Sequence, residues 1–135
     1  MSLKECKLLK LPTFPEERGT LTVIEGNNHI PFDLKRIYYV YEVPENQKRG
    51  SHSNKYSSQV MIALNGKFNV TLDDGKEKKK FTLDNPSIGL YVPHMVWIDA
   101  DNFTRGTIML ILRPTIYDKN DYIGDYEEFK RRIEK

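Results

Sequence analysis

Side chains that bind metals or form disulfides are scarce in this sequence, which has one cysteine, Cys6, and three histidines among its 135 residues. A single cysteine cannot form an internal disulfide, which is typical of a reducing compartment, so we expect a cytoplasmic protein. No apolar run approaches the ~20 residues that cross a membrane, and no signal-peptide pattern opens the chain. We therefore expect a soluble protein without a membrane partner.

An excess of charge of one sign is also missing. The 21 basic and 19 acidic residues give a net charge of +2, which is too small for a field that would attract nucleic acid. The densest charge is the lysine-rich run 76–80, which follows the turn signal DDG at 73–75 and is interpreted as a solvated hairpin. We expect no nucleic-acid partner. The length suits one domain that spans residues 1–135.

Short β segments separated by turn residues fill most of the chain. Strands are predicted at residues 20–24, 36–41, 60–64, 67–72, 79–83, 89–92, 95–98 and 107–112. Strands at this spacing favour a sandwich or a barrel. The dipeptide Asn65-Gly66 predicts a hairpin between its two flanking strands. Only the end differs, because residues 121–131 place acidic side chains before basic ones and predict a short helix.

The segment 49–66, RGSHSNKYSSQVMIALNG, has the spacing of the first metal-binding motif of a cupin barrel. His52 and Asn54 lie two residues apart, so on a strand they share one face. In a metal-binding cupin, two histidines and a glutamate occupy the positions of His52, Asn54 and Gln59, and an amide is a poor metal ligand. The remaining ligand position falls on Ile98. Because three of the four ligands are missing, we expect no bound metal.

Five segments together resemble the nucleotide-sugar 3,4-ketoisomerases. They are KRIYYVYEV, RGSHSNK, QVMIALNG, LDNPSIGLYVPHMVW and YDKNDYIGDYEEF, and the likeness runs from about Arg18 to Phe129. The resemblance implies an all-β, RmlC-like cupin jelly-roll β-barrel with a short C-terminal helix, without a metal or a cofactor and usually a homodimer. It also implies conversion of dTDP-4-keto-6-deoxyglucose to its 3-keto isomer, which normally feeds an aminotransferase in the synthesis of surface polysaccharides.

This isomerisation removes the proton at C3, passes through an enediolate and reprotonates C4, so it needs one base and a few hydrogen-bond donors. His52 suits the base because the pKa of histidine lies near neutrality. The family motif is RGxHxH, and Asn54 replaces its second histidine, although an amide cannot take a proton. Either His52 acts alone while Asn54 orients hydroxyl groups, or another side chain transfers the second proton. Candidates are Tyr38, Tyr39 and Asp99, and Tyr38 is favoured because the RxYY strand faces the pocket in the family.

Two arginines are candidates for holding the substrate. Arg49 can place its planar fork on the diphosphate or on sugar hydroxyl groups. Arg36 alternates with Tyr38 on one strand face, and such a pair suits the lining of a pocket inside a small barrel. The alternative is that Ile37 and Tyr39 face inward instead.

The other candidate residues have less specific roles. Gln59 is expected to form hydrogen bonds inside the barrel, and Ile98 to lie close to the sugar, where relatives carry a polar residue. Trp97 either stacks on thymine or packs in the core. Arg18 matches relatives that carry arginine in this turn and is a possible pocket residue. His94 is predicted to lie in a turn or at the rim, and packing between helix and barrel is predicted for Tyr117, Tyr122 and Tyr126.

Two further functions remain open at this point. Because Asn54 replaces a histidine, the protein could bind the dTDP-sugar without turning it over. The same enolate chemistry could also serve a 3- or 5-epimerase. The segment from Ser2 to Leu11 alternates apolar residues without an obvious partner strand in a short chain, so we expect it to pair across the two-fold axis of a homodimer.

Overall fold

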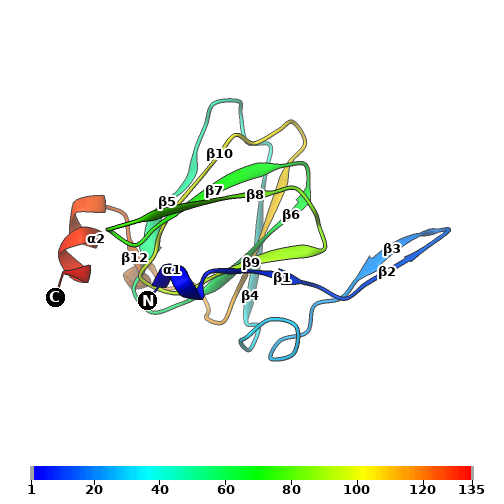
Figure 1. Cartoon of the computed structure of the whole chain (residues 1–135), viewed down its shortest axis with the longest axis horizontal. Helices are drawn as coiled ribbons and strands as arrows, with labels where there is room; N and C mark the ends of the chain where they lie inside the picture. The colour runs from blue at the N-terminus through cyan, green and yellow to red at the C-terminus, as the bar shows by residue number, and fades with distance from the viewer. Residues whose placement is uncertain (1, 135) are drawn as a thin grey trace.

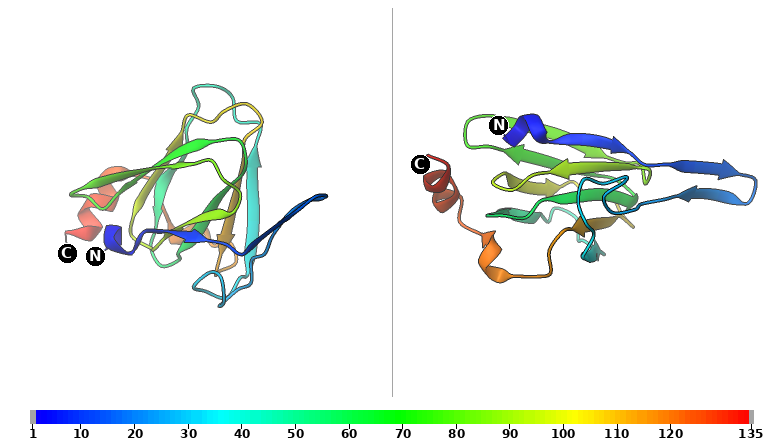
Figure 2. Two further views of the ribbon diagram at one scale, coloured as in Figure 1. Left: turned by 45° about the vertical axis from the view of Figure 1, so that its right-hand side comes forward. Right: turned by 90° about the horizontal axis from the view of Figure 1, so that it is seen from below.

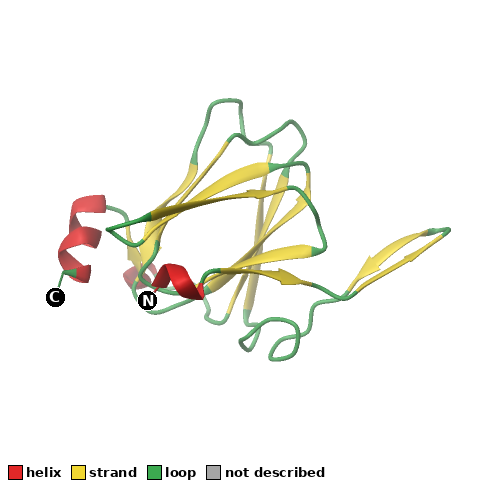
Figure 3. Cartoon of the chain, in the orientation of Figure 1, coloured by secondary structure: helices red, strands yellow, loops and turns green. Residues whose placement is uncertain are grey.

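Two five-stranded antiparallel sheets face each other in the computed structural model, which describes residues 2–134 (Figures 1 and 3). The first sheet has the order β1 (Lys7–Lys10), β9 (Ile88–Val92), β6 (Gln59–Asn65), β11 (Ile108–Arg113) and β4 (Arg36–Tyr41). The second has the order β12 (Tyr122–Ile123), β5 (Arg49–Asn54), β10 (Trp97–Asp101), β7 (Phe68–Asp73) and β8 (Lys78–Leu83).

Three helical segments and one hairpin complete the described chain. The hairpin is formed by β2 (Thr13–Glu16) and β3 (Gly19–Thr22), and it projects away from the two sheets (Figure 2). The helical segments are α1 (Ser2–Glu5), the 3₁₀ turn η1 (Lys119–Asp121) and α2 (Tyr126–Ile133). None of the helices in residues 2–134 is long and apolar enough to cross a membrane.

The strand order is that of a jelly roll. The set β9-β6-β11-β4 faces the set β5-β10-β7-β8, so chain neighbours such as β4 and β5 lie in opposite sheets. This is the double Greek-key arrangement of the cupin fold. The prediction of an all-β cupin with a short C-terminal helix is confirmed.

The turn at Asn65-Gly66 does not form the predicted hairpin. It carries the chain from β6 in the first sheet to β7 in the second, and these two strands do not pair. Asn65 donates a hydrogen bond to the carbonyl oxygen of Gly106 at 2.8 Å. Gly66 has φ of 76°, and an added Cβ would come within 2.3 Å of Thr107 Oγ1. The dipeptide therefore forms a tight turn that connects the two sheets.

The predicted turn at 73–75 does form a hairpin. Asp73 pairs with Lys78 across the β7–β8 ladder, and the Asp74 carboxylate accepts hydrogen bonds from the backbone of Lys76 and Glu77. These hydrogen bonds outweigh a small desolvation effect and lower the pKa of Asp74. Lysines then line β8, which is the last strand of its sheet, and charge on such an edge discourages pairing with another chain.

Most strand boundaries agree with the predictions within two residues, and β4 agrees fully. The predicted strand at 95–98 begins later, at Trp97. The helix predicted to begin at 121 begins at Tyr126, because η1 and β12 occupy the preceding segment. The N-terminal segment has a partner strand within its own chain, because its β1 pairs with β9 from Lys7↔Tyr91 to Lys10↔Ile88. Its expected pairing across a two-fold axis stays a prediction.

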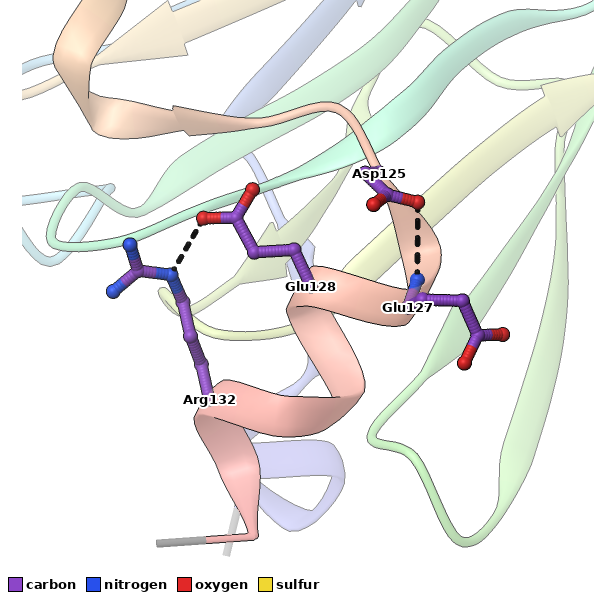
Figure 4. Close-up of polar contacts among 4 residues, drawn as sticks. All are labelled: Asp125, Glu127, Glu128 and Arg132. Atoms are coloured by element: carbon purple, nitrogen blue, oxygen red, sulfur yellow. Dashed lines mark hydrogen bonds and ion pairs between the residues drawn. The ribbon is translucent and has the colours of Figure 1, made fainter.

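Helix α2 packs at one end of the second sheet, next to the start of β10 and the turn between β7 and β8 (Figure 1). Its Phe129 is fully buried against Trp97. The Asp125 side chain accepts a hydrogen bond from the Glu127 backbone and so caps the first turn. One turn along, Arg132 Nε lies 3.0 Å from Glu128 Oε2 (Figure 4). Capping and apolar contact together fix the C-terminal segment on the sheet.

Candidate active site

A cavity of about 500 Å³ lies between the two sheets. Its polar lining consists of Arg36, Tyr38, Arg49, His52, Gln59, Tyr117 and Tyr122. Its apolar lining includes Val40, Met61, Ile98, Ala100, Met109 and Ile111. The alternation of β4 therefore places Arg36 and Tyr38 inward, while Tyr39 and Tyr41 are exposed on the opposite face.

His52 lies on β5, which pairs with β10 so that His52 is opposite Ile98. Its ring centre is 5.2 Å from that of Tyr122, and its Nε2 is buried and accepts no hydrogen bond from the part of the chain that the structure describes. Burial lowers the pKa of His52 below its ordinary value of 6.5, the positive charge of Arg113 lowers it further, and the backbone of Gly50 partly opposes both. At neutral pH the imidazole is therefore uncharged and can accept a proton.

Tyr38 lies on β4 and faces the same cavity. Its hydroxyl oxygen accepts two hydrogen bonds from Arg113, one from Nε at 3.2 Å and one from Nη2 at 3.1 Å. Burial raises the pKa of Tyr38 above 10.0, although the adjacent Arg113 lowers it. The phenol is thus protonated at neutral pH and can donate a proton to a ligand in the cavity.

Asn54 lies beneath the cavity and does not line it. The side chain is 2% exposed. Its Oδ1 accepts a hydrogen bond from Arg113 Nη1 at 3.0 Å, and its Nδ2 donates one to Asp121 Oδ2 at 2.9 Å. Gln59 lines the cavity and donates a longer hydrogen bond, of 3.4 Å, to the same Oδ1.

Asp121 completes the buried polar cluster from the C-terminal segment. Its carboxylate accepts hydrogen bonds from the Ser57 hydroxyl, from the Tyr56 backbone at 2.8 Å and from Asn54. Burial alone would raise the pKa of Asp121, but these hydrogen bonds outweigh it and leave the pKa below its ordinary value. The carboxylate is therefore charged at neutral pH.

Arg36 is held at the cavity by aromatic side chains. Its guanidinium carbon lies 5.3 Å from the ring centre of Tyr38 and 5.6 Å from that of Tyr117, and its Nη2 is 3.4 Å from the Tyr122 hydroxyl. Its Nε is buried without a partner in the described chain. Arginine in such a site can bind a phosphate or a sugar oxygen.

The role predicted for the C-terminal tyrosines is correct for only one of the three. Tyr117 and Tyr122 line the cavity. Tyr126 packs edge-on against Trp97 and donates a hydrogen bond of 2.6 Å to Asp73 Oδ2, which raises the pKa of Tyr126 to about 12. For Tyr122 the difference arises because it lies on β12, which pairs with β5, the strand that carries His52.

Trp97 packs under α2 and lies outside the cavity, so of its two predicted roles the structure supports core packing. Its Nε1 donates a hydrogen bond of 3.1 Å to Asp99 Oδ2, and Ser51 donates one of 2.7 Å to Asp99 Oδ1. Asp99 is thus engaged outside the cavity and Tyr39 faces away. Of the three candidates for the second proton transfer, only Tyr38 lines the cavity.

The remaining candidates divide between cavity and surface. Arg49, Gln59 and Ile98 line the cavity. Arg18 lies in the turn of the projecting hairpin, where its exposed guanidinium is 3.6 Å from Glu16. His94 is exposed in the turn before β10. The expected ligand positions hold Asn54, Gln59 and Ile98, and no cluster of three or more histidine, cysteine, aspartate or glutamate side chains occurs in the described residues.

Sequence reasoning missed Arg113 and Asp121. Arg113 is fully buried and connects Tyr38 with Asn54, and Asp121 anchors the other side of Asn54. One signal for Arg113 was available, because a charged residue directly follows the apolar run 108–112 in phase with its inward positions. Asp121 gave no comparable signal in the sequence.

The comparisons with known proteins agree with this geometry. A family profile described as "FdtA: WxcM-like, C-terminal" matches residues 4–134. The chain is 40% identical over 131 residues to a TDP-4-oxo-6-deoxy-alpha-D-glucose-3,4-oxoisomerase of Aneurinibacillus thermoaerophilus, covering 97% of this chain and 94% of the relative.

Solved structures show the same similarity. QdtA, a sugar 3,4-ketoisomerase of Thermoanaerobacterium thermosaccharolyticum in complex with TDP, matches with a TM-score of 0.95 at 39% identity, covering 98% of this chain and 96% of QdtA. A dTDP-4-dehydrorhamnose 3,5-epimerase of Bacillus anthracis shares the fold, with a TM-score of 0.78 at 16% identity over 92% of this chain and 80% of the epimerase. Since the family profile and the 40% identical relative both span nearly the whole sequence, the chain belongs to the FdtA family of WxcM-like proteins.

Proposed function

We propose that this protein is a 3,4-ketoisomerase of TDP-4-keto-6-deoxyglucose. The observation that carries the proposal is that His52 and Tyr38 line one cavity in complementary protonation states at neutral pH. An uncharged imidazole can accept a proton from carbon, and a protonated phenol can donate one to oxygen. Pairs of groups with opposed protonation states are typical of acid–base catalysis.

The two side chains can account for every proton that the reaction moves. His52 takes the proton from C3 while Tyr38 donates its proton to the C4 carbonyl oxygen, and this gives an enediol. His52 then returns a proton to C4 as the C3 hydroxyl loses its proton to the Tyr38 phenolate, and C3 becomes the carbonyl. Both side chains finish in their starting states. The reaction uses no second histidine and no metal.

The cavity suits a nucleotide-linked sugar in size and charge. Its volume of about 500 Å³ is typical of small-molecule sites. Arg36 and Arg49 supply positive charge for the diphosphate, and Gln59 offers an amide beside the sugar. Ile98 leaves an apolar surface opposite His52 where relatives are expected to carry a polar group.

Isotope exchange tests the proposal directly. The protein is incubated with TDP-4-keto-6-deoxyglucose in deuterated buffer, and NMR follows C3 and C4 of the hexose. We expect a 3-keto product that carries deuterium at C4, because the proton on His52 exchanges with solvent before its return. Substrate that binds but remains unchanged would contradict an isomerase and support a non-catalytic binding protein. Deuterium at C3 or C5 with the 4-keto group retained would indicate an epimerase.

We also propose that the protein is a homodimer. The hairpin β2–β3 exposes Phe14 and Leu21, which are 56% and 61% exposed, and the outer face of β4 exposes Ile37, Tyr39 and Tyr41. A second copy that covers these side chains would remove apolar area from water. Light scattering after size-exclusion chromatography tests this, and a monomer at micromolar concentration would contradict it.

Arg18 bears on the same proposal. It is exposed in the turn of the hairpin, away from the cavity of its own chain. A role of Arg18 in substrate binding would therefore require the cavity of a second copy. By membership of the family, we propose that the enzyme acts in the cytoplasm and that its product serves the synthesis of deoxyamino sugars for surface polysaccharides.

A further inference from the structure

Arg113 is the last residue of β11. It is charged and buried between the sheets, with none of its surface exposed. Four hydrogen bonds satisfy its guanidinium: two to the Tyr38 hydroxyl, one to Asn54 Oδ1 and one to the Ser57 hydroxyl at 3.2 Å. A buried guanidinium is costly unless its donors are satisfied in a fixed geometry. Its position therefore depends on these three partners.

Asn54 and Ser57 connect this cation to a buried anion. Asn54 accepts from Arg113 through Oδ1 and donates to Asp121 through Nδ2, and Ser57 accepts from Arg113 and donates to the same carboxylate. The amide orientation follows from its neighbours, because the carboxylate only accepts and the guanidinium only donates. Each side chain thus bridges two opposite charges that are not in direct contact in the described chain.

This arrangement fixes the direction of the Tyr38 hydroxyl proton. The phenol oxygen already accepts two N–H donors from Arg113, so its own proton cannot point toward the guanidinium. It is directed to the remaining side, where the cavity lies. The same two donors and the positive charge stabilise the phenolate that forms after proton donation.

We propose that Asn54 and Arg113 are positioning residues for Tyr38: Asn54 holds Arg113 in place, and Arg113 orients the Tyr38 hydroxyl toward the substrate and stabilises its phenolate. This inference rests on the proposed isomerase function. It gives the asparagine that replaces the second motif histidine a role beneath the cavity, with no contact to the sugar.

A double-mutant cycle on kcat tests the coupling. We expect Tyr38→Phe to lower kcat about 100-fold and Asn54→Ala about tenfold, with KM and the Kd for TDP within about twofold of the native values. In the double variant we expect kcat within about threefold of Tyr38→Phe alone. A roughly 1000-fold loss, as independent effects would give, would overturn the proposal, as would a tenfold increase of KM in Asn54→Ala.

Ser53→Ala is the matched control, because Ser53 is the buried neighbour of Asn54 and its hydroxyl has no partner in the described chain. We expect native kcat for this variant. If Asn54→Ala does not fold, Asn54→Ser replaces it, since serine retains an oxygen that can accept from a guanidinium. With this variant too, additive losses of kcat in the cycle would overturn the proposal.

NMR separates this inference from the proposed function. With ζ-¹³C-tyrosine, the Tyr38 signal is assigned through Tyr38→Phe and recorded at neutral pH without substrate. We expect the signal to shift in Asn54→Ala, to shift further in Arg113→Lys and to stay in place in Ser53→Ala. If the native protein makes no product, the proposed function fails, and this measurement still tests the positioning of Tyr38. An unchanged Tyr38 signal in Asn54→Ala would overturn the inference.

Discussion

The inward faces of β4 and β11 differ between their two ends. At one end Arg36 pairs with Arg113, and at the other Val40 pairs with Met109. Charge is stable inside the first end because β5 and the C-terminal segment supply Asn54, Asp121 and Tyr122 as partners. At the second end Val40 and Met109 line the cavity with apolar side chains, and the charged residue near Val40 is Arg49. One pair of strands therefore provides both a reactive end and a shape-determining end of the same cavity.

The largest expected effect is a loss of kcat on substitution of His52, which lines the cavity from β5 next to Ile98 of β10. We expect His52→Gln to lower kcat about 10³-fold, because general bases contribute typically 10²–10⁴-fold. The Kd for TDP should change by less than about threefold. NMR detection of the 3-keto product and calorimetry with TDP measure the two quantities.

His94→Gln is the control for that variant, because His94 is exposed in a turn outside the cavity. It should retain native kcat. If the His52→Gln variant retained more than a tenth of native kcat, another base would have to act, and the reactive end would need a different assignment.

The next largest effect is expected on the affinity for TDP, at the end of the cavity that contains Arg36. We expect Arg36→Met to weaken TDP binding about 30-fold, because it removes a cation that lines the cavity without altering its apolar surface. The exposed residue Lys35 gives the control, and Lys35→Met should bind TDP within about twofold of native. Equal affinities of the two variants, measured by calorimetry, would show that the diphosphate lies elsewhere, with Arg49 as the next candidate.

The pH dependence of kcat/KM sharpens the comparison without a mutation. Burial lowers the pKa of His52 below 6.5, so activity should persist down to pH 6.5 and fall only below it, as the imidazole is protonated. Burial raises the pKa of Tyr38 above 10.0, so no alkaline loss is expected below pH 10. A profile with its acid midpoint above pH 7 would contradict an uncharged, buried His52 as the base.

The same pKa has a consequence for stability. Because the folded-state pKa of His52 lies below the unfolded value, the unfolded chain binds more protons between the two. The contribution of His52 to the free energy of unfolding is therefore present above pH 6.5 and is lost as the pH falls. Denaturant titrations at pH 8 and pH 5 should show that the free energy of unfolding falls less between these two pH values in His52→Gln than in the native chain.

The cavity-lining residues on β4, β5 and β6 could be predicted because they follow local rules, unlike Tyr117 and Tyr122. Two-residue alternation places Arg36 and Tyr38 on one face of β4, and the motif spacing identifies His52 and Gln59. Each of these side chains faces inward for a reason that is visible within a few residues of sequence. The same holds for the β7–β8 hairpin, whose turn residues satisfy their own backbone.

The buried cluster beneath the cavity could not be predicted in this way. Asn54 and Arg113 are 59 residues apart, and Asp121 reaches Asn54 from 67 residues away. Their contact depends on which strands face each other across the jelly roll. The Asn65-Gly66 turn illustrates the limit, since the dipeptide specifies a tight turn but does not determine whether its flanking strands pair with each other or with distant strands.

The smallest effect is expected at the apolar end, where Met109 is buried opposite Val40. Met109→Leu keeps the volume and polarity of the lining, so we expect kcat within about twofold of native and a stability loss below about 1.5 kcal/mol. Met109→Gln should instead cost about 1–3 kcal/mol, because its amide would be buried among apolar side chains without a partner. Thermal denaturation compares the two variants. If the glutamine variant were as stable as the leucine variant, water would reach this end of the cavity. The two ends would then not differ in polarity, and that difference could not explain why the chemistry is confined to His52 and Tyr38.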